Sequence, residues 1–380
     1  MDFSEKDQVF MARAIKIAKR GRFTARPNPM VGCVVVKDNQ IIGEGWHRVY
    51  GQAHAEINAL KQAGSLAKGA TCYVTLEPCC HHGKTPPCAQ ALIDAGIVKV
   101  ISAMRDPNPK VDGGGFSLLN KAGIQTQYGL LEKESRNLNR GFISRFETGK
   151  PWVTLKLAMS LDGKTALADG SSQWITGSLA REDVQKLRAK QDAILTGIGT
   201  FLADDPSLNV RPENSEWWNQ LEDNQKDFSQ PRKILLDRKG RANLNSKFFN
   251  EMGSLPQKKA KDVWWVKENK LIKVFNSQVT DTNQSFGKLS KVLEYSAKNG
   301  VNNLLVESGH LLAGAFINDS LVDEIIVYIA PKLMGKDAMS LVNLHVEQMG
   351  ECPVFKLKGV KQFGDDVRLS FLVEKANKEK

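Results

Sequence analysis

The sequence predicts an α/β protein of two domains. It has 380 residues, of which 41% are hydrophobic and 25% charged, so each of two domains can bury its own core. Short β-branched runs alternate with helical patterns through both halves, which is typical of helices layered on a sheet. Gly149, Lys150 and Pro151 interrupt the alternation and predict a boundary between domains of residues 1–149 and 150–380.

The first domain begins with a helix and a hairpin. Ser4 and Asp7 form the pattern of a capping box, and apolar residues at helical spacing then predict a helix that stops near Gly21. Two β-branched runs around Asp38-Asn39 predict a hairpin with residues 30–36 and 41–46 as its arms. The next elements expected are a helix at 54–63, a strand at 72–77, a helix at 86–95 and a strand at 98–103.

The second domain shows the same alternation. Strands are expected at residues 152–158, 193–196, 233–237, 303–307 and 324–329, with helices at 178–189 and near residue 314. Residues 213–230 are polar and acidic and contain two tryptophans, so we expect a surface excursion there whose tryptophans pack on the surface rather than cap a site.

The positive charge could serve a polyanionic partner or belong to a solvated surface, and it does not indicate a nucleic acid; a small phosphorylated ligand would need only a few Arg or Lys locally. There are 53 Lys and Arg against 42 Asp and Glu, a net charge of +11, but the excess is spread thinly along the chain. No apolar run approaches the roughly 20 residues that span a bilayer, and the first residues lack the apolar core of a secretory signal. We therefore expect a cytoplasmic enzyme that uses neither a membrane nor a nucleic acid.

A cluster of cysteines and histidines predicts a metal site. Four of the six cysteines fall within seventeen residues, and disulfides are disfavoured in a chain without an export signal. His54, Cys79 and Cys88 are ligands suited to zinc, and three protein ligands leave one position open for a water whose pKa falls toward neutrality. Glu56 lies too far around a helix to bind the same ion and is better placed as a general acid/base.

Two alternatives to a catalytic zinc stay open. His81 could supply a fourth ligand and close the site, which would make the zinc structural, or the cysteines could simply be buried without metal. Cys79 is preferred to Cys80 as the ligand because it directly follows Pro78.

Three motifs resemble the deaminase half of the bifunctional riboflavin-biosynthesis deaminase/reductase family. They are His54-Ala-Glu56, VTLEPCCHHGKTPPC at residues 74–88 and RPNPMVGCVVV at residues 26–36, and the long C-x₈-C spacing is the specific mark. The resemblance implies a three-layer domain like cytidine deaminase that removes the ring 2-amino group of a phosphorylated ribosylaminopyrimidine as ammonia. It further implies substrate contacts from Asn28, His47, Lys84, Asp106 and Asn108. For Asn28 and Asn108 the alternative is turn formation beside prolines.

Taken alone, the second half favours nucleotide binding only slightly. The glycines at 197 and 199 are too few for a full dinucleotide fingerprint. The strand ending at Glu307 leads through Gly309 into a helix, where free N–H groups would suit a pyrophosphate. A plain strand-to-helix turn would give the same pattern.

The second half is also similar to the reductase half of that family. The matching segments are 156–163, 172–176 and 187–211. The similarity implies a dihydrofolate-reductase-like domain that uses NADPH to reduce the ring-opened ribosyl group to ribityl, and a homodimer. The implied NADPH contacts are Ala158, Trp174, Thr200, Asp204, Gly309, His310, Leu311, Leu312, Ala313, Gly314 and Ala315. The implied substrate contacts are Ser172, Arg188, Leu208, Arg211 and Glu307.

Arg188 and Arg211 are permanent, forked cations that suit a 5′-phosphate, and Lys156 and Glu307 are the candidates for protonating the sugar. Two other functions remain as alternatives. A nucleic-acid base deaminase with an appended binding domain would show basic stripes and C-x-x-C spacing, neither of which occurs. A zinc-stabilised binding protein without catalysis would leave Glu56 unexplained.

Overall fold

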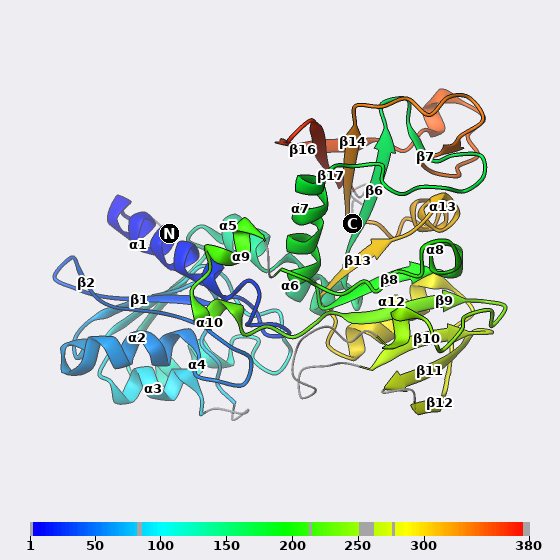
Figure 1. Ribbon diagram of the computed structural model, residues 1–380. Helices are drawn as coiled ribbons and strands as arrows, with labels where there is room; N and C mark the ends of the chain where they lie inside the picture. Colours follow the sequence, from blue (N-terminus) through cyan, green and yellow to red (C-terminus); the bar gives the residue numbers. More distant parts are fainter. Residues whose placement is uncertain (1–2, 82–85, 213–214, 251–261, 276–277, 375–380) are drawn as a thin grey trace. The chain divides into compact units, whose positions relative to one another are not determined.

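A computed structural model of the chain describes residues 3–81, 86–212, 215–250, 262–275 and 278–374. The chain forms two compact units, each built around its own main sheet (Figure 1). The first unit comprises Met1–Gly149 and Leu221–Phe228, and the second comprises Lys150–Gln220 and Ser229–Lys380.

The first unit has a five-stranded sheet in the order β2-β1-β3-β4-β5. Its strands are β1 (Gly32–Lys37), β2 (Gln40–Trp46), β3 (Thr71–Val74), β4 (Lys99–Ser102) and β5 (Gln125–Tyr128). Strands β3, β4 and β5 are parallel, whereas β1 pairs antiparallel with β2 and β3. Its helices are α1 (Glu5–Ala18), α2 (Ala55–Ala63), α3 (Cys88–Asp94), α4 (Gly114–Lys121), α5 (Glu132–Leu138) and α6 (Arg140–Thr148), with α10 (Asp223–Lys226) from the second segment.

Alternation along the strands gives this unit three layers. Val34 and Val36 of β1 pack in one cluster with α1, while Cys33 and Val35 pack in another with α2 and α3. Successive strand residues face opposite sides, so one sheet is covered by helices on both faces. The predicted three-layer α/β domain is confirmed.

Local signals placed the first elements correctly. Ser4 caps α1 and exchanges hydrogen bonds with Asp7, as a capping box does. Asp38 and Asn39 take positive φ angles of 51° and 61° at the turn between β1 and β2. That left-handed conformation is tolerated best by such short polar residues, which is why the pair predicts a hairpin.

The second unit has a ten-stranded sheet in the order β12-β11-β10-β9-β8-β13-β6-β14-β17-β16. Its strands are β6 (Trp152–Ser160), β8 (Ala193–Gly197), β9 (Arg232–Asp237), β10 (Val263–Lys267), β11 (Lys270–Phe275), β12 (Gln278–Ser285), β13 (Asn303–Glu307), β14 (Glu324–Ala330), β16 (Phe355–Phe363) and β17 (Asp366–Val373). The six strands from β10 to β14 in this order are parallel, and antiparallel strands extend both edges.

A separate two-stranded sheet pairs β7 (Lys164–Ala166) with β15 (Met339–Ser340). The helices of this unit are α7 (Ser178–Ala189), α8 (Ile198–Asp204), α9 (Glu216–Asn219), α11 (Lys247–Asn250), α12 (Leu289–Lys298) and α13 (His310–Asn318). Short 3-10 turns follow α1 and α2 and precede β16, at Lys19–Gly21, Gly64–Ala67 and Met349–Glu351.

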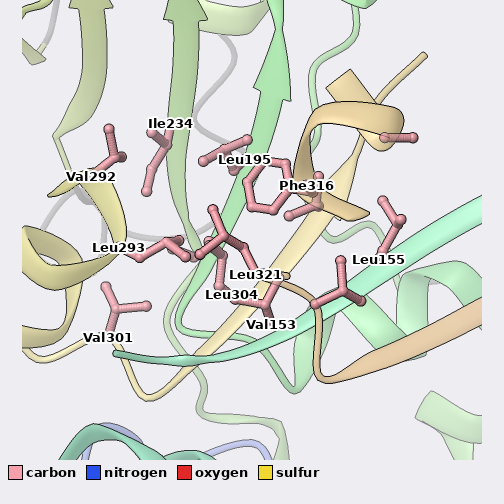
Figure 2. Close-up of a cluster of buried hydrophobic side chains, with 14 of the residues drawn as sticks. Val153, Leu155, Leu195, Ile234, Val292, Leu293, Val301, Leu304, Phe316 and Leu321 are labelled. Carbon is pink, nitrogen blue, oxygen red and sulfur yellow. The ribbon is translucent and has the colours of Figure 1, made fainter. Parts of the chain in front are cut away.

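Helices cover both faces of the large sheet. On one face, α12 and α13 contribute to the main core, which gathers the side chains of Leu155, Leu195, Leu304 and Phe316 (Figure 2). On the other face, α7 packs over β14, and α8 and α11 pack over β8 and β9. The catalytic candidates of the second unit lie on this second face.

The segment expected as a surface excursion is partly buried, which corrects the sequence expectation. Trp217, Leu221 and Phe228 are buried, and Leu221–Phe228 belongs to the first unit. There Gln225 Nε2 donates a 3.1 Å hydrogen bond to the Arg20 carbonyl. The mostly polar composition did not indicate that three widely spaced apolar residues would be buried. Residues 213 and 214 lie outside the described part of the chain.

Among the described residues, no helix is both long and apolar enough to span a bilayer.

Leu304 tests the importance of the main core of the second unit. Its side chain is fully buried, so Leu304→Ala should lower the free energy of unfolding by about 2–5 kcal/mol, measured by urea denaturation. Leu333→Ala is the matched control because Leu333 is 73% exposed after β14, and it should cost well under half as much. Equal losses in the two variants would contradict this placement of the core.

Candidate active sites

The first candidate site brings His54, Cys79 and Cys88 together. His54 caps α2, Cys88 is the first residue of α3, and Cys79 lies in the loop after β3. Their ligand atoms all lie within 4.8 Å of one another, with His54 Nδ1 3.2 Å from Cys88 Sγ and 3.6 Å from Cys79 Sγ. A tetrahedral zinc ion with ordinary bond lengths would hold such atoms about 3.5 Å apart, so the three residues fit zinc.

The hydrogen-bond donors around Cys79 favour its thiolate form. Its Sγ accepts hydrogen bonds from the Cys88 thiol and the His54 ring, and the Cys88 backbone N–H donates at 3.3 Å. These donors lower the pKa of Cys79 to about 4 in spite of burial. The thiolate in turn raises the pKa of His54. Deprotonated sulfur is the form that binds zinc.

The alternative ligands do not join this group. Cys80 Sγ lies 3.9 Å from the Lys110 carbonyl instead, and the His81 side chain is exposed. Within the residues that the structure describes, no fourth His, Cys, Asp or Glu completes the cluster. Three ligands without a fourth protein donor are the pattern of a catalytic zinc rather than a structural one.

Glu56 is buried beside this cluster. Its carboxyl group is hydrogen-bonded with the Cys88 side chain, whereas Oε2 has no hydrogen-bond partner among the described residues. Burial, followed by the charge of Cys79, raises the pKa of Glu56 to about 7. A carboxyl group with that pKa can both accept and release a proton near neutral pH.

Asn28 and His47 contact each other next to the cluster. His47 Nδ1 lies 3.2 Å from the Ala53 carbonyl, so it carries the proton and donates. His47 Nε2 is then the acceptor for the Asn28 amide at 3.1 Å. Burial lowers the pKa of His47 to about 4, which agrees with a neutral ring. The arrangement leaves the Asn28 Oδ1 and one N–H for a ligand, and the His47 ring packs edge-on against His54 at 5.2 Å.

Asp106 and Asn108 lie in the loop after β4 and take part in turns. Asp106 Oδ1 accepts the Asn108 N–H at 2.9 Å, and Asn108 Oδ1 accepts the Lys110 N–H at 3.1 Å. The turn-forming alternative therefore holds for Asn108, whose single side-chain oxygen accepts a hydrogen bond within the loop. Burial raises the pKa of Asp106 to about 7. Their substrate contacts stay a prediction, and Lys84 lies outside the described residues.

The second candidate site is a group of charged side chains beside the carboxyl end of β13. Lys156 on β6 and Glu307 on β13 are neighbours in the strand register. Arg188 reaches them from α7 and donates from Nε and Nη2 to Glu307 at 2.6 and 2.9 Å, while its Nη1 donates to the Asn209 carbonyl at 3.3 Å. The structure thus engages Arg188 with Glu307, and its predicted contact with the substrate stays untested.

Burial and the neighbouring charges shift the pKa values of Lys156 and Glu307. Burial lowers the pKa of Lys156. Burial alone would raise the pKa of Glu307, but the Arg188 guanidinium outweighs it, so the pKa lies below the ordinary value. Near neutral pH Glu307 is therefore a carboxylate, and Lys156 is the group that loses a proton more easily than usual.

The predicted NADPH residues gather around the start of α13. The Gly309 N–H donates to Thr200 Oγ1 at 3.0 Å. Asp204, the last residue of α8, accepts from Ser172 and Gln173 at 3.5 and 3.2 Å. Trp174 is 65% exposed, and the Arg181 guanidinium lies 4.7 Å from its ring centre.

Some of these residues can meet a ligand only through the backbone. The Ala313 side chain is buried in the main core, and a Cβ on Gly314 would lie 2.0 Å from the Asn343 carbonyl oxygen. Leu208 is likewise buried in a core cluster. By contrast, His310, Leu311, Leu312 and Ala315 are at least partly exposed on α13, as are Ala158 on β6 and Arg211 in its loop.

Two hydrogen-bond networks could not be predicted from the sequence. Glu77, only part of a motif in sequence, accepts backbone hydrogen bonds from the loop after β4 and from α4. Beneath α7, Asp183 accepts hydrogen bonds from Tyr328 and Arg368. Asp183 and Arg368 are 185 residues apart, so no local pattern could connect them.

Comparisons with known proteins match both halves of the chain. The family model for the cytidine and deoxycytidylate deaminase zinc-binding region matches residues 4–104, and the model for the RibD C-terminal domain matches residues 151–369. The riboflavin biosynthesis protein RibD of Escherichia coli is 44% identical over 375 residues, which cover 96% of this chain and 98% of that protein. RibD of Aquifex aeolicus is 37% identical over 97% of this chain and 98% of its own length.

Solved structures agree over both units. RibD of Acinetobacter baumannii has a TM-score of 0.85 at 42% identity, covering 98% of this chain and 99% of that one. The diaminohydroxyphosphoribosylaminopyrimidine deaminase/5-amino-6-(5-phosphoribosylamino)uracil reductase of Thermotoga maritima has a TM-score of 0.80 at 32% identity, covering 97% and 99%.

The Arg188–Glu307 pair should dominate the stability of its site. Glu307→Gln leaves the buried guanidinium without an opposing charge, so the free energy of unfolding should fall by about 3 kcal/mol in urea denaturation. Replacing both partners, as Arg188→Met with Glu307→Leu, should recover most of the loss. A double variant as unstable as Glu307→Gln would contradict a burial cost as the cause.

The same pair should give an acid-dependent contribution to stability. Since the pKa of Glu307 is lowered by folding, its contribution is fully present above the unfolded value of about 4.3 and is lost as pH falls through the lower folded value. The stability difference between the native chain and Glu307→Gln should therefore shrink below about pH 4, measured as urea midpoints from pH 7 to 3. A constant difference over that range would contradict the assignment.

Proposed function

The chain belongs to the RibD family of bifunctional deaminase/reductases of riboflavin biosynthesis, and we propose that residues 1–149 perform the deamination and residues 150–380 the reduction. As a member of this family it is a zinc-dependent and NADPH-dependent enzyme. The positions of the two family models support the division of labour, and the convergence of His54, Cys79 and Cys88 beside Glu56 is the observation that carries the deaminase assignment.

We assign the two reactions to one phosphorylated pyrimidine. The Thermotoga maritima relative is described as a deaminase of diaminohydroxyphosphoribosylaminopyrimidine and a reductase of 5-amino-6-(5-phosphoribosylamino)uracil. The product of the first reaction is the substrate of the second, so both activities on one chain act consecutively. Similarity over both halves favours this function over a nucleic-acid deaminase or a non-catalytic zinc protein.

In the deamination, Glu56 moves the protons. Zinc held by His54, Cys79 and Cys88 supplies the positive charge that makes a water molecule nucleophilic near neutral pH. Glu56 takes one proton from the attacking water and delivers it to the departing amino nitrogen. A carbon–oxygen bond forms, the carbon–nitrogen bond breaks and ammonia leaves. The pKa of about 7 and the unpartnered Oε2 of Glu56 support this role.

The pyrimidine ring is held by amide groups. Asn28 keeps one acceptor and one donor for the ring edge because His47 fixes its orientation. Asp106 and Asn108 contact the substrate from the loop after β4, and Lys84 contacts its phosphate. Burial of Asp106 and the nearness of His47 to His54 support this placement beside the metal ligands.

In the reduction, we assign proton donation to Lys156. The start of α13 together with Thr200, Asp204 and Trp174 would hold NADPH, and the chemistry that NADPH would supply there is hydride donation to C1′ of the ring-opened sugar. Lys156 has a lowered pKa and can give up the accompanying proton, whereas Glu307 is held as a carboxylate by Arg188 and accepts hydrogen bonds from sugar hydroxyls. Ser172 and the Leu208 backbone complete the site, and exposed Arg211 contacts the phosphate.

We also propose a cytoplasmic homodimer. Strand β16 is one edge of the ten-stranded sheet and exposes Leu357 and Val360 at 54% and 58%, which supports pairing of that edge with a second copy. All six cysteines are unbridged, including Cys33 and Cys72, whose sulfur atoms lie 3.3 Å apart. Free thiols so close together support a reducing compartment.

Glu56→Gln tests the deaminase assignment. The amide cannot carry the proton, so ammonia release should fall by roughly 10²–10⁴-fold while bound zinc and NADPH-dependent reduction are retained. Ammonia production, zinc content and NADPH oxidation on the deaminated substrate would be measured on one preparation. Glu134→Gln, an exposed carboxylate of the same unit, is the control and should keep all three. Undiminished ammonia release in Glu56→Gln would refute the role.

A charge on β16 tests the dimer. Val360→Lys should convert the dimer to a monomer in light scattering, because two lysines would oppose each other across the paired edge. Val279→Lys is the control on β12 at the other edge, where Val279 is 49% exposed. An unchanged mass for Val360→Lys, or a monomeric native chain, would exclude pairing through β16.

A further inference from the structure

The carboxylate of Glu77 is buried between the metal-ligand loop and α4. Glu77 lies two residues before Cys79, and only 3% of it is exposed. Its Oε2 accepts the N–H groups of Asp106 and Gly113 at 3.3 and 3.2 Å. Its Oε1 accepts those of Gly115 and Phe116 at 3.0 and 3.3 Å. Both oxygens are therefore fully engaged with backbone donors.

These donors stand at the two ends of one loop. Asp106 lies early in the loop after β4, which ends at Ser102, and Gly113 caps α4 at the end of that loop. One carboxylate thus closes the loop of residues 106–113, which carries Asp106 and Asn108. A negative charge at a helix start is also favourable for α4 itself. The bonds connect this loop to the segment that holds Cys79.

The start of α4 also packs tightly against the segment that contains Cys79. A Cβ on Gly115 would lie 2.0 Å from the Pro78 carbonyl oxygen, and one on Gly114 would lie 2.7 Å from Cys80 Sγ. The first turn of α4 therefore packs against the Pro78 carbonyl and the Cys80 side chain, which lie on either side of Cys79. Movement of α4 would carry the end of the loop with it.

We propose that Glu77 is a positioning residue of the deaminase: it holds the loop of residues 106–113 against the Cys79 segment and so sets the substrate-binding position of Asp106 and Asn108. This inference rests on the proposed deaminase function. Glu77 touches neither the substrate nor the metal. Its effect is therefore on substrate affinity, while zinc binding by His54, Cys79 and Cys88 does not depend on it.

Glu77→Gln is the direct test because the amide keeps the volume but offers only one acceptor oxygen. Its NH₂ group would face two of the four backbone donors. Hydrogen bonds to a charged group are strong enough that their loss should raise the KM of deamination by about tenfold or more, with kcat changed less than about threefold. Zinc content and the reductase kcat of the same chain should be unchanged.

A second variant reaches the same loop by packing alone. Gly115→Ala should also raise the KM of deamination with zinc retained, since its Cβ pushes α4 away from Pro78. Glu44→Gln is the control. It removes a partly buried ion pair with Arg13 in the same unit and does not affect the loop of residues 106–113. It should leave the KM unchanged.

These measurements distinguish a failure of the positioning role of Glu77 from a failure of the proposed deaminase function. A native chain that releases no ammonia from the phosphoribosylaminopyrimidine would refute the deaminase function. If the native chain is active, an unchanged KM in Glu77→Gln would overturn the positioning role, as would loss of bound zinc from that variant, because Glu77 would then support the metal ligands. If Glu77→Gln does not fold, the KM of Gly115→Ala decides, and an unchanged value there overturns the proposal.

Discussion

Close packing of α2 against β2 places the first metal ligand, and the deaminase site depends on it. A Cβ on Gly45 would lie 2.2 Å from the Ala55 carbonyl oxygen, so only glycine allows the helix to start this near the sheet. His54 caps that helix and Cys88 begins α3, which puts both ligands at helix N-termini.

The role of each carboxylate in these sites depends on how many of its oxygens accept a hydrogen bond. Glu77 accepts hydrogen bonds from backbone N–H groups, and Asp183 accepts one from the Tyr328 side chain. Each carboxylate thereby holds separate segments of the chain together. Glu307 is held by a guanidinium and stays charged. Glu56 has a buried oxygen, Oε2, without a partner in the described structure, and its high pKa suits a group that exchanges protons.

The fold could be predicted where short-range signals agree with burial. The capping box of Ser4 and the Asp38-Asn39 turn each act over a few residues, and the alternation of strand and helix patterns predicted the layers. The interval 213–230 was mispredicted because its polar residues dominate the composition, while its folding depends on the widely spaced Trp217, Leu221 and Phe228. Sparse anchors of this kind leave no periodic pattern.

The sequence by itself determined the metal chemistry, because ligand types and the spacing of Cys79 and Cys88 follow from the chain alone and suit only a few ions. It also identified Glu56, since two residues along a helix place a carboxylate near but off the metal. Only the tertiary structure decided that Arg188 is engaged with Glu307, 119 residues away, and that Glu77 closes a loop. Such partners are set by which strands and helices become neighbours, and long-range contacts of that kind have no local sequence signature.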